Sequence, residues 1–199
     1  IILCLEPEPF CLLETSAECL AFFSQKLFQQ AHGDICRRYI GLCFDTCHLA
    51  CQWEDLRASI SAIEAAGIRI PKAQISVALE LQKPGANPRG VKRLQSFVEP
   101  RYLHQSIASN GLRAEDLPQI FQSAGQLKSE WQAAPAIRTH FHVPIFWSGD
   151  DAIATTKSSL QGVIPALLDA GCRHFEVETY SWNVIPEETR NELADDLNG

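Results

Sequence analysis

An alternation of short apolar runs with longer amphipathic stretches constrains the fold of this chain more than any other feature. The apolar runs predict β-strands at residues 3–5, 39–44, 68–77, 137–143 and 174–178. The amphipathic stretches predict helices at residues 15–31, 53–66, 115–128 and 155–170, with a last helix beginning at Pro186. Strands that alternate with helices pair in parallel, because each parallel step needs a crossover connection. We therefore predict an α/β fold with about five βα units.

Local signals support several of these boundaries. Thr15 and Glu18 form a capping-box pattern that predicts the start of a helix. Gly67 and Gly171 each follow an amphipathic stretch, where glycine commonly ends a helix. Residues 81–111 are rich in Pro, Gly and Asn, and we expect a long irregular loop there, of the kind that often carries function.

Composition excludes several classes of protein. The 199 residues are 46% hydrophobic and 21% charged, which is typical of a globular chain and not of a fibrous or disordered one. The net charge of −7 argues against a broad nucleic-acid-binding or anionic-membrane surface, since both need positive charge. No apolar run is long enough to cross a bilayer. Eight cysteines without a Cys-x-x-Cys pair indicate free thiols in a reducing compartment, so we expect a cytoplasmic protein.

Two architectures accommodate the predicted units. A five-stranded doubly wound sheet would be complete, but no glycine-rich phosphate-binding fingerprint follows any predicted strand. A (β/α)8 barrel needs eight units in about 250 residues, so roughly three units would have to precede Ile1. The chain begins in a predicted strand and contains no Met. These features favour a partial (β/α)8 TIM barrel, with residues 1–199 as the C-terminal part of one domain, and leave the doubly wound sheet as the weaker alternative.

Polar side chains gather at the carboxyl ends of the predicted strands. Residues two apart on a strand face the same side, and the carboxyl ends of barrel strands converge on one face. Carboxylates and imidazoles together suit Zn²⁺ or Mn²⁺, whereas Mg²⁺ is better served by oxygen ligands. Each residue alone also has a structural explanation, such as a capping Asp or a core His, so it is the joint pattern that predicts a divalent metal site. The strand-end residues are Glu6, Glu8, Asp45, His48, Lys72, Gln74, His140, His142, Glu176 and Glu178.

Several of these strand-end motifs resemble those of one superfamily. Leu5-Glu6-Pro7, Asp45-Thr46-Cys47-His48, His140-Phe141-His142 and Val177-Glu178-Thr179 look like motifs of the xylose isomerase-like TIM barrels, which include sugar isomerases, epimerases and endonuclease IV enzymes. The fuller pattern resembles the EboE family of metabolite traffic proteins over nearly the whole chain. That closer match includes Lys72-Ala73-Gln74-Ile75-Ser76, Tyr102-Leu103-His104-Gln105 and Thr179-Tyr180-Ser181-Trp182.

The resemblance implies roles for particular residues. It implies metal ligands at Glu6, Asp45, His48, His142 and Glu178, and His140 is a further candidate ligand on the same strand as His142. The chain departs from many relatives by carrying Lys72 and Gln74 where they have a histidine on the sixth barrel strand. Because an ammonium group beside a dication is repelled, we expect Lys72, together with His48, to act electrostatically or in proton transfer.

Three functions are compatible with such a site. A metal-dependent isomerase or epimerase would act on a small polyol or hydroxycarbonyl metabolite. A non-catalytic metabolite carrier, working with other proteins of an export pathway as the EboE resemblance implies, would use the same barrel mouth. An endonuclease IV-like phosphodiesterase is a further alternative, but the acidic charge and the lack of Lys/Arg clusters lead us to expect no nucleic-acid partner.

Overall fold

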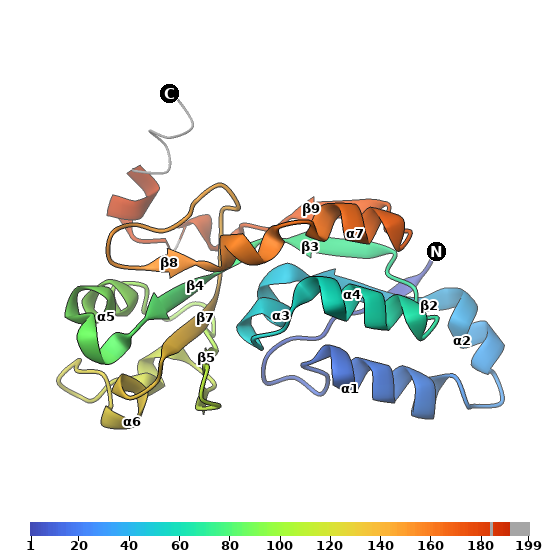
Figure 1. Ribbon diagram of the computed structural model, residues 1–199, viewed down its shortest axis with the longest axis horizontal. Helices are drawn as coiled ribbons and strands as arrows, with labels where there is room; N and C mark the ends of the chain where they lie inside the picture. The colour runs from blue at the N-terminus through green and yellow to red at the C-terminus, as the bar shows by residue number, and fades with distance from the viewer. Residues whose placement is uncertain (184, 192–199) are drawn as a thin grey trace. The chain divides into compact units, whose positions relative to one another are not determined.

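The computed structural model describes residues 1–183 and 185–191, which fall into two compact units. The first unit comprises Ile1–Ser76 and Ser158–Glu178, and the second comprises Val77–Lys157 and the chain from Thr179 onward. The first unit carries a four-stranded parallel sheet, and the second carries a five-stranded antiparallel sheet (Figure 1). The chain is therefore a mixed α/β protein.

The first unit is built on a parallel sheet of order β1-β2-β3-β9. Its strands are β1 (Leu3–Leu5), β2 (Ile40–Asp45), β3 (Lys72–Ile75) and β9 (His174–Val177). Its helices are α1 (Ser16–Ala21) with its π-helical continuation η1 (Phe22–Leu27), α2 (Gly33–Tyr39), α3 (Thr46–Cys51), α4 (Leu56–Ala65) and α7 (Val163–Asp169). Register places Asp45 of β2 level with Gln74 of β3, and Gln74 level with Glu176 of β9.

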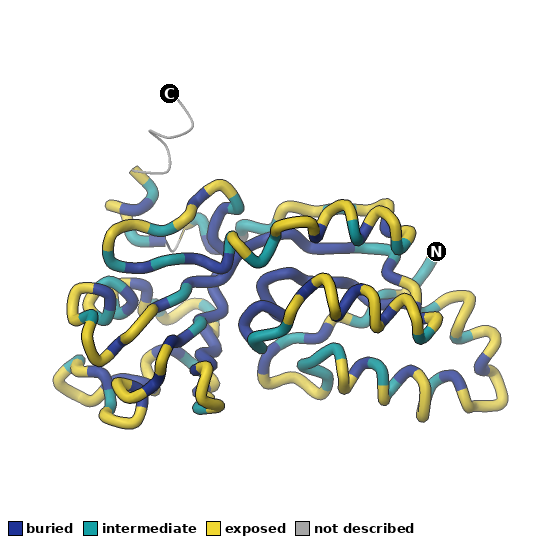
Figure 2. The backbone as a smooth tube through the Cα atoms, in the orientation of Figure 1, coloured by how far each residue is buried: buried dark blue, intermediate teal, exposed yellow. Residues whose placement is uncertain are grey.

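The pleat of this sheet separates an apolar side from a polar side. Leu42 and Phe44 are fully buried on β2, and they alternate with Cys43 and Asp45. Residues that alternate along a strand point to opposite faces. The apolar face and the buried stripe of α4 supply much of the core of this unit, while the other face presents Asp45 and its neighbours in register. Figure 2 shows β2 and β3 largely buried, β1 and β9 more exposed, and the outer faces of the helices exposed.

Several local predictions in this unit are confirmed. The strand β1 has the predicted bounds, and Thr15 caps α1 in a reciprocal capping box with Glu18. Helix α4 begins at the Asp55 cap and is followed by Gly67, whose φ of 70° lies in the left-handed region that glycine adopts without strain.

The helix predicted at residues 155–170 is interrupted, because Gly162 has a φ of 74° between the 3-10 helix η4 (Thr156–Leu160) and α7.

The second unit contains an antiparallel sheet of order β6-β5-β7-β4-β8. Its strands are β4 (Val77–Gln82), β5 (Ser106–Ala108), β6 (Arg113–Ala114), β7 (Ala136–Val143) and β8 (Ala154–Thr155). Its helical segments are η2 (Pro84–Ala86), α5 (Pro88–Gln95), η3 (Leu117–Ile120), α6 (Ser129–Gln132) and η5 (Tyr180–Asn183). Glu80 and Arg138 are paired in the β4–β7 ladder, and their side chains form a 2.7 Å ion pair.

The antiparallel sheet of this unit shows that the prediction of parallel pairing for all strands was wrong. The strand predicted at residues 137–143 is present as β7, but it runs antiparallel to β4 and β5. The strand predicted at residues 68–77 divides at Ser76, so the chain passes from β3 into β4 without a crossover helix, and a crossover is what parallel pairing needs. The described residues do not form a closed barrel, because β1 pairs with β2 alone and β9 with β3 alone.

Two further predictions in the second unit were wrong. The helix predicted at residues 115–128 is the short η3, followed by a turn in which Phe121 and Leu127 form an antiparallel bridge and Gly125 has a φ of 79°. The segment 81–111 is not irregular throughout, because Asn87 caps the helix α5 within it and β5 follows.

The helix expected after Pro186 is present at residues 187–191, and residues 192–199 lie outside the described part. Among the described residues, no helix has the length and apolar character needed to cross a membrane.

Candidate metal centre

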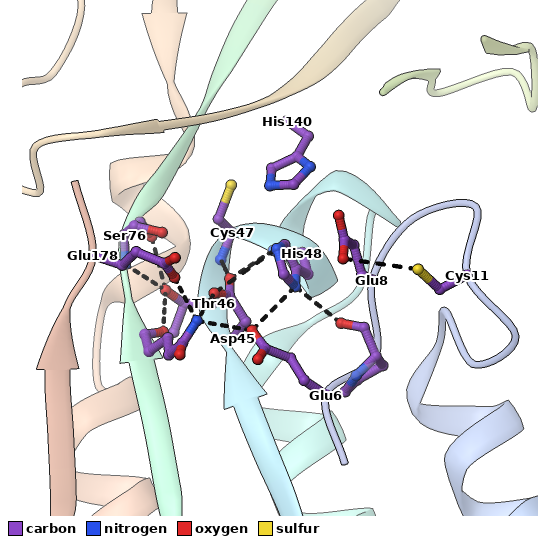
Figure 3. A network of polar contacts seen from close by, with 12 residues as sticks. Glu6, Glu8, Cys11, Asp45, Thr46, Cys47, His48, Ser76, His140 and Glu178 are labelled. Atoms are coloured by element: carbon purple, nitrogen blue, oxygen red, sulfur yellow. Dashed lines mark hydrogen bonds and ion pairs between the residues drawn. The ribbon is translucent and has the colours of Figure 1, made fainter. Parts of the chain in front are cut away.

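Three carboxylates of the first unit meet at the carboxyl edge of its parallel sheet. Glu6 directly follows β1, Asp45 is the last residue of β2, and Glu178 directly follows β9. One oxygen from each lies within 4.8 Å of the other two. We call Glu6, Asp45 and Glu178 the carboxylate cluster; Figure 3 shows their side chains turned toward one another. Since parallel strands end at the same edge, the topology brings together residues that are up to 172 positions apart in the sequence.

The two oxygens of Asp45 have different partners. Oδ1 accepts hydrogen bonds from the backbone N–H groups of Cys47 at 2.7 Å and His48 at 2.9 Å, so Asp45 is the N-cap of α3. Oδ2 faces the cluster, 3.2 Å from the amide nitrogen of Gln74 and 4.0 Å from Nε2 of His48. Asp45 is fully buried. One oxygen of Asp45 therefore caps α3, and the other faces the cluster, where it is placed to bind a ligand.

The ring of His48 is oriented by the chain after β1. Its Nδ1 lies 3.0 Å from the carbonyl oxygen of Pro7 and 3.7 Å from Oε1 of Glu6. A carbonyl oxygen can only accept, so Nδ1 carries a hydrogen and the neutral ring has its lone pair on Nε2. This is the tautomer that a metal-binding histidine adopts when its other nitrogen donates to a backbone carbonyl. His48 thus adds an imidazole nitrogen next to the carboxylate cluster.

Gln74 donates into the middle of the cluster. Its Nε2 lies 2.8 Å from Oε1 of Glu6 and 3.2 Å from Oδ2 of Asp45, and it also donates to Glu178. A carboxamide has only two hydrogens, so it cannot give a full hydrogen bond to three carboxylates at once. The negative charge of the cluster is therefore only partly compensated by this neutral group.

The pKa values of the cluster reflect this excess of negative charge. The pKa of Glu178 is raised to about 7, first by burial and then by the nearby carboxylates of Asp45 and Glu6, against an opposing effect of His48. Burial also raises the pKa of Glu6. Close carboxylates in a partly buried site cannot all ionise freely. The cluster therefore favours binding either a proton or a cation.

The raised pKa of Glu178 predicts a loss of stability as the pH rises in chelator-treated protein. The unfolded chain releases this proton near pH 4.5, whereas the folded chain keeps it up to about pH 7. Between these values the folded state binds more protons, so the free energy of unfolding falls as the pH rises, by about 1–2 kcal/mol once the exposure of the carboxyl is taken into account. Urea denaturation between pH 5 and 8 measures this change. A Glu178→Gln variant should lose this part of the slope, and an unchanged slope would contradict the assignment.

Lys72 is held beside the cluster by Gln74 and Glu176. Its Nζ lies 2.6 Å from Oε2 of Glu176 and donates to Oε1 of Gln74 at 2.7 Å. The hydrogen bond to Glu176 raises the pKa of Lys72, so the group stays an ammonium at neutral pH. In the structure Lys72 is thus a fixed positive charge beside the cluster. Glu8, the other acid after β1, accepts a 3.7 Å hydrogen bond from the thiol of Cys11.

The predicted ligands His140 and His142 belong to the second unit, on β7. Both are buried, and their Nε2 atoms are 2.7 Å apart. Nδ1 of His140 lies 2.6 Å from Oε1 of Gln105, which can only accept, so the neutral His140 accepts the hydrogen shared with His142. Gln105, His140 and His142 therefore form a hydrogen-bonded chain within the second unit, in which Gln105 fixes the orientation of the His140 ring.

From the sequence, Gln74 was one of the strand-end polar residues and a departure from the sixth-strand histidine, but no particular role was predicted for it. The register explains why it matters, since Gln74 lies level with Asp45 on one side and Glu176 on the other. A polar residue at the same height as two acids on neighbouring strands is the signal that could have found it.

The chain was compared with protein-family models, with curated proteins and with solved structures, and none of the three comparisons found a match. The candidate site accordingly depends on the geometry of its own residues.

Proposed function

We propose that the carboxylate cluster binds one divalent cation and that the chain handles a small-molecule metabolite at this ion, as part of an EboE-like protein of the xylose isomerase-like TIM-barrel type. The observation that carries the proposal is the amide of Gln74, whose two hydrogens face three carboxylates. A dication would compensate the charge that this amide leaves uncompensated. The sequence motifs at the strand ends support the family, and the parallel sheet of the first unit is compatible with it.

The donor set favours Mn²⁺ or Zn²⁺. Oxygens of Glu6, Asp45 and Glu178, with the Nε2 of His48 beside them, make a mixed carboxylate and imidazole site. Mg²⁺ prefers oxygen ligands alone and is therefore the weaker candidate. When bound, the ion would supply Lewis acidity toward a hydroxyl or carbonyl oxygen.

The residues around the cluster fit a polyol or hydroxycarbonyl ligand. Vicinal oxygens of such a molecule can chelate open positions of a cation. The ammonium of Lys72 supplies a fixed positive charge close to the cluster, and the imidazole of His48 lies beside Asp45. A Lewis-acidic ion with a fixed charge beside it suits sugar isomerase or epimerase chemistry.

The first test is cation binding to chelator-treated protein. Calorimetric titration with Mn²⁺ should give about one equivalent, and a concentration of one hundred times the Kd should stabilise the fold by about 2.7 kcal/mol. Glu178→Gln keeps the size of the side chain but removes a charged ligand, and it should bind Mn²⁺ at least about tenfold more weakly. The matched control is Glu64→Gln, an exposed acid on α4, which should bind like the parent. A folded parent that binds no Mn²⁺ or Zn²⁺ overturns the proposal.

A further inference from the structure

We propose that the amide of Gln74 occupies the cation position of the carboxylate cluster, and that Lys72 holds it there. The inference depends on the proposed function, since it concerns access to the same cluster. Nε2 of Gln74 contacts the same three carboxylates, Glu6, Asp45 and Glu178, that lie close enough to share an ion. A cation coordinated by these oxygens would have to take the place of this nitrogen.

The orientation of the Gln74 amide is fixed by the hydrogen bond that its oxygen accepts. Oε1 of Gln74 accepts a hydrogen bond from Nζ of Lys72 at 2.7 Å, and Glu176 holds that ammonium at 2.6 Å. Reversing the amide would place its NH2 group against the ammonium, with two donors facing each other, and would turn its oxygen toward carboxylates. Both changes are unfavourable. The Lys72–Glu176 pair therefore keeps the donor end of Gln74 in the cluster.

The sheet leaves the amide little freedom to move. Lys72 and Gln74 are two residues apart on β3, so they share one face of the sheet, and each is level with a residue of β9. Only 8% of Gln74 is exposed. A cation that enters must displace the amide from three carboxylates, while Lys72 holds its oxygen in place. Lys72 is thus a positioning residue that lowers the affinity of the site for cations.

The proposal and a purely supporting role for Gln74 predict opposite changes in cation affinity when Gln74 is replaced. If Gln74 only orients the ligands, its loss weakens cation binding. If it occupies the cation position, Gln74→Leu should bind Mn²⁺ about tenfold more tightly, since a hydrogen-bonded competitor among charged groups has been removed. Lys72→Met should also tighten binding, and Lys72→Arg, which keeps a charged donor, should restore affinity close to that of the parent.

The experiment is a double-mutant cycle on Mn²⁺ affinity, measured by calorimetry on chelator-treated protein. Lys72→Met combined with Gln74→Leu should bind no more tightly than Gln74→Leu alone, because Lys72 acts through Gln74. Additive effects would show that Lys72 acts by charge alone, and weaker binding by Gln74→Leu would show a supporting role; either result overturns the inference. If Gln74→Leu does not fold, Gln74→Asn, whose amide is one methylene shorter, takes its place.

Two controls separate this inference from the proposed function. Lys26→Met removes an exposed lysine of the same unit and should leave affinity unchanged. Equal affinity in the parent, Lys72→Met and Gln74→Leu would overturn the inference and leave the cation site intact. Binding in none of these folded proteins would overturn the proposed function itself.

Discussion

Replacing Asp45 with alanine should remove cation binding and destabilise the fold in a single step. One oxygen of Asp45 caps α3 and the other belongs to the carboxylate cluster. Loss of an Asp cap costs about 1–2 kcal/mol of stability. Loss of the ligand oxygen should weaken Mn²⁺ binding by at least about a hundredfold, the upper end of the effect that even outer-shell partners of a metal ligand produce. Urea denaturation and calorimetry measure the two effects separately.

Two matched variants separate the cap from the ligand. Asp45→Asn retains an oxygen for the N–H groups of Cys47 and His48, because Asn caps helices about as well as Asp, but it removes the negative charge. It should fold stably and bind Mn²⁺ weakly. Asp55 caps α4 in the same way, with its Oδ1 accepting hydrogen bonds from the backbone N–H groups of Arg57 and Ala58. Asp55→Ala should lose stability and keep Mn²⁺ affinity. Parent-like Mn²⁺ affinity in Asp45→Asn would show that the cluster does not need this charge.

Phe44→Ala should cause a large loss of stability in the first unit. Phe44 is fully buried on β2, and it points to the face of the sheet opposite Asp45, its neighbour in the strand. Truncation of a buried Phe removes its transfer free energy and leaves a cavity that the surroundings fill incompletely, at a cost of about 3–5 kcal/mol. The midpoint of urea denaturation, monitored by circular dichroism, should fall accordingly.

The size of the side chain provides the control for this prediction. Phe44→Leu keeps most of the apolar volume and should cost less than half as much as Phe44→Ala. Phe10 is partly exposed, at 39%, and Phe10→Ala should have a much smaller effect. A loss of about 1 kcal/mol or less for Phe44→Ala would contradict the packing described for β2.

Local signals in the sequence predicted local structure well. The bounds of β1, the capping box at Thr15 and the turn at Gly67 depend on residues within a few positions of one another, and all three are confirmed. The pairing direction of β7 was wrong, because it depends on the break at Ser76 and on partner strands far away in the sequence. Hydrophobic periodicity alone does not indicate whether neighbouring strands are parallel or antiparallel.

The candidate site shows the same limit. Acids at the ends of β1, β2 and β9 could be identified because the carboxyl ends of parallel strands meet at one edge, and the structure brings Glu6, Asp45 and Glu178 together there. The arrangement of Lys72, Gln74 and Glu176 could not be predicted, because it depends on the register of β3 against two other strands and on the direction of a single amide. Both are properties of assembled strands.

The double use of Asp45 has a consequence for how the site can be observed. The amide hydrogens of Cys47 and His48 are bonded to a carboxylate whose other oxygen faces the cluster. Whatever binds the cluster and restrains that carboxylate also restrains the first turn of α3, and by thermodynamic reciprocity a firmer first turn favours the ligand. Solvent exchange of these two hydrogens is therefore a built-in reporter of occupancy, readable without any label on the ligand.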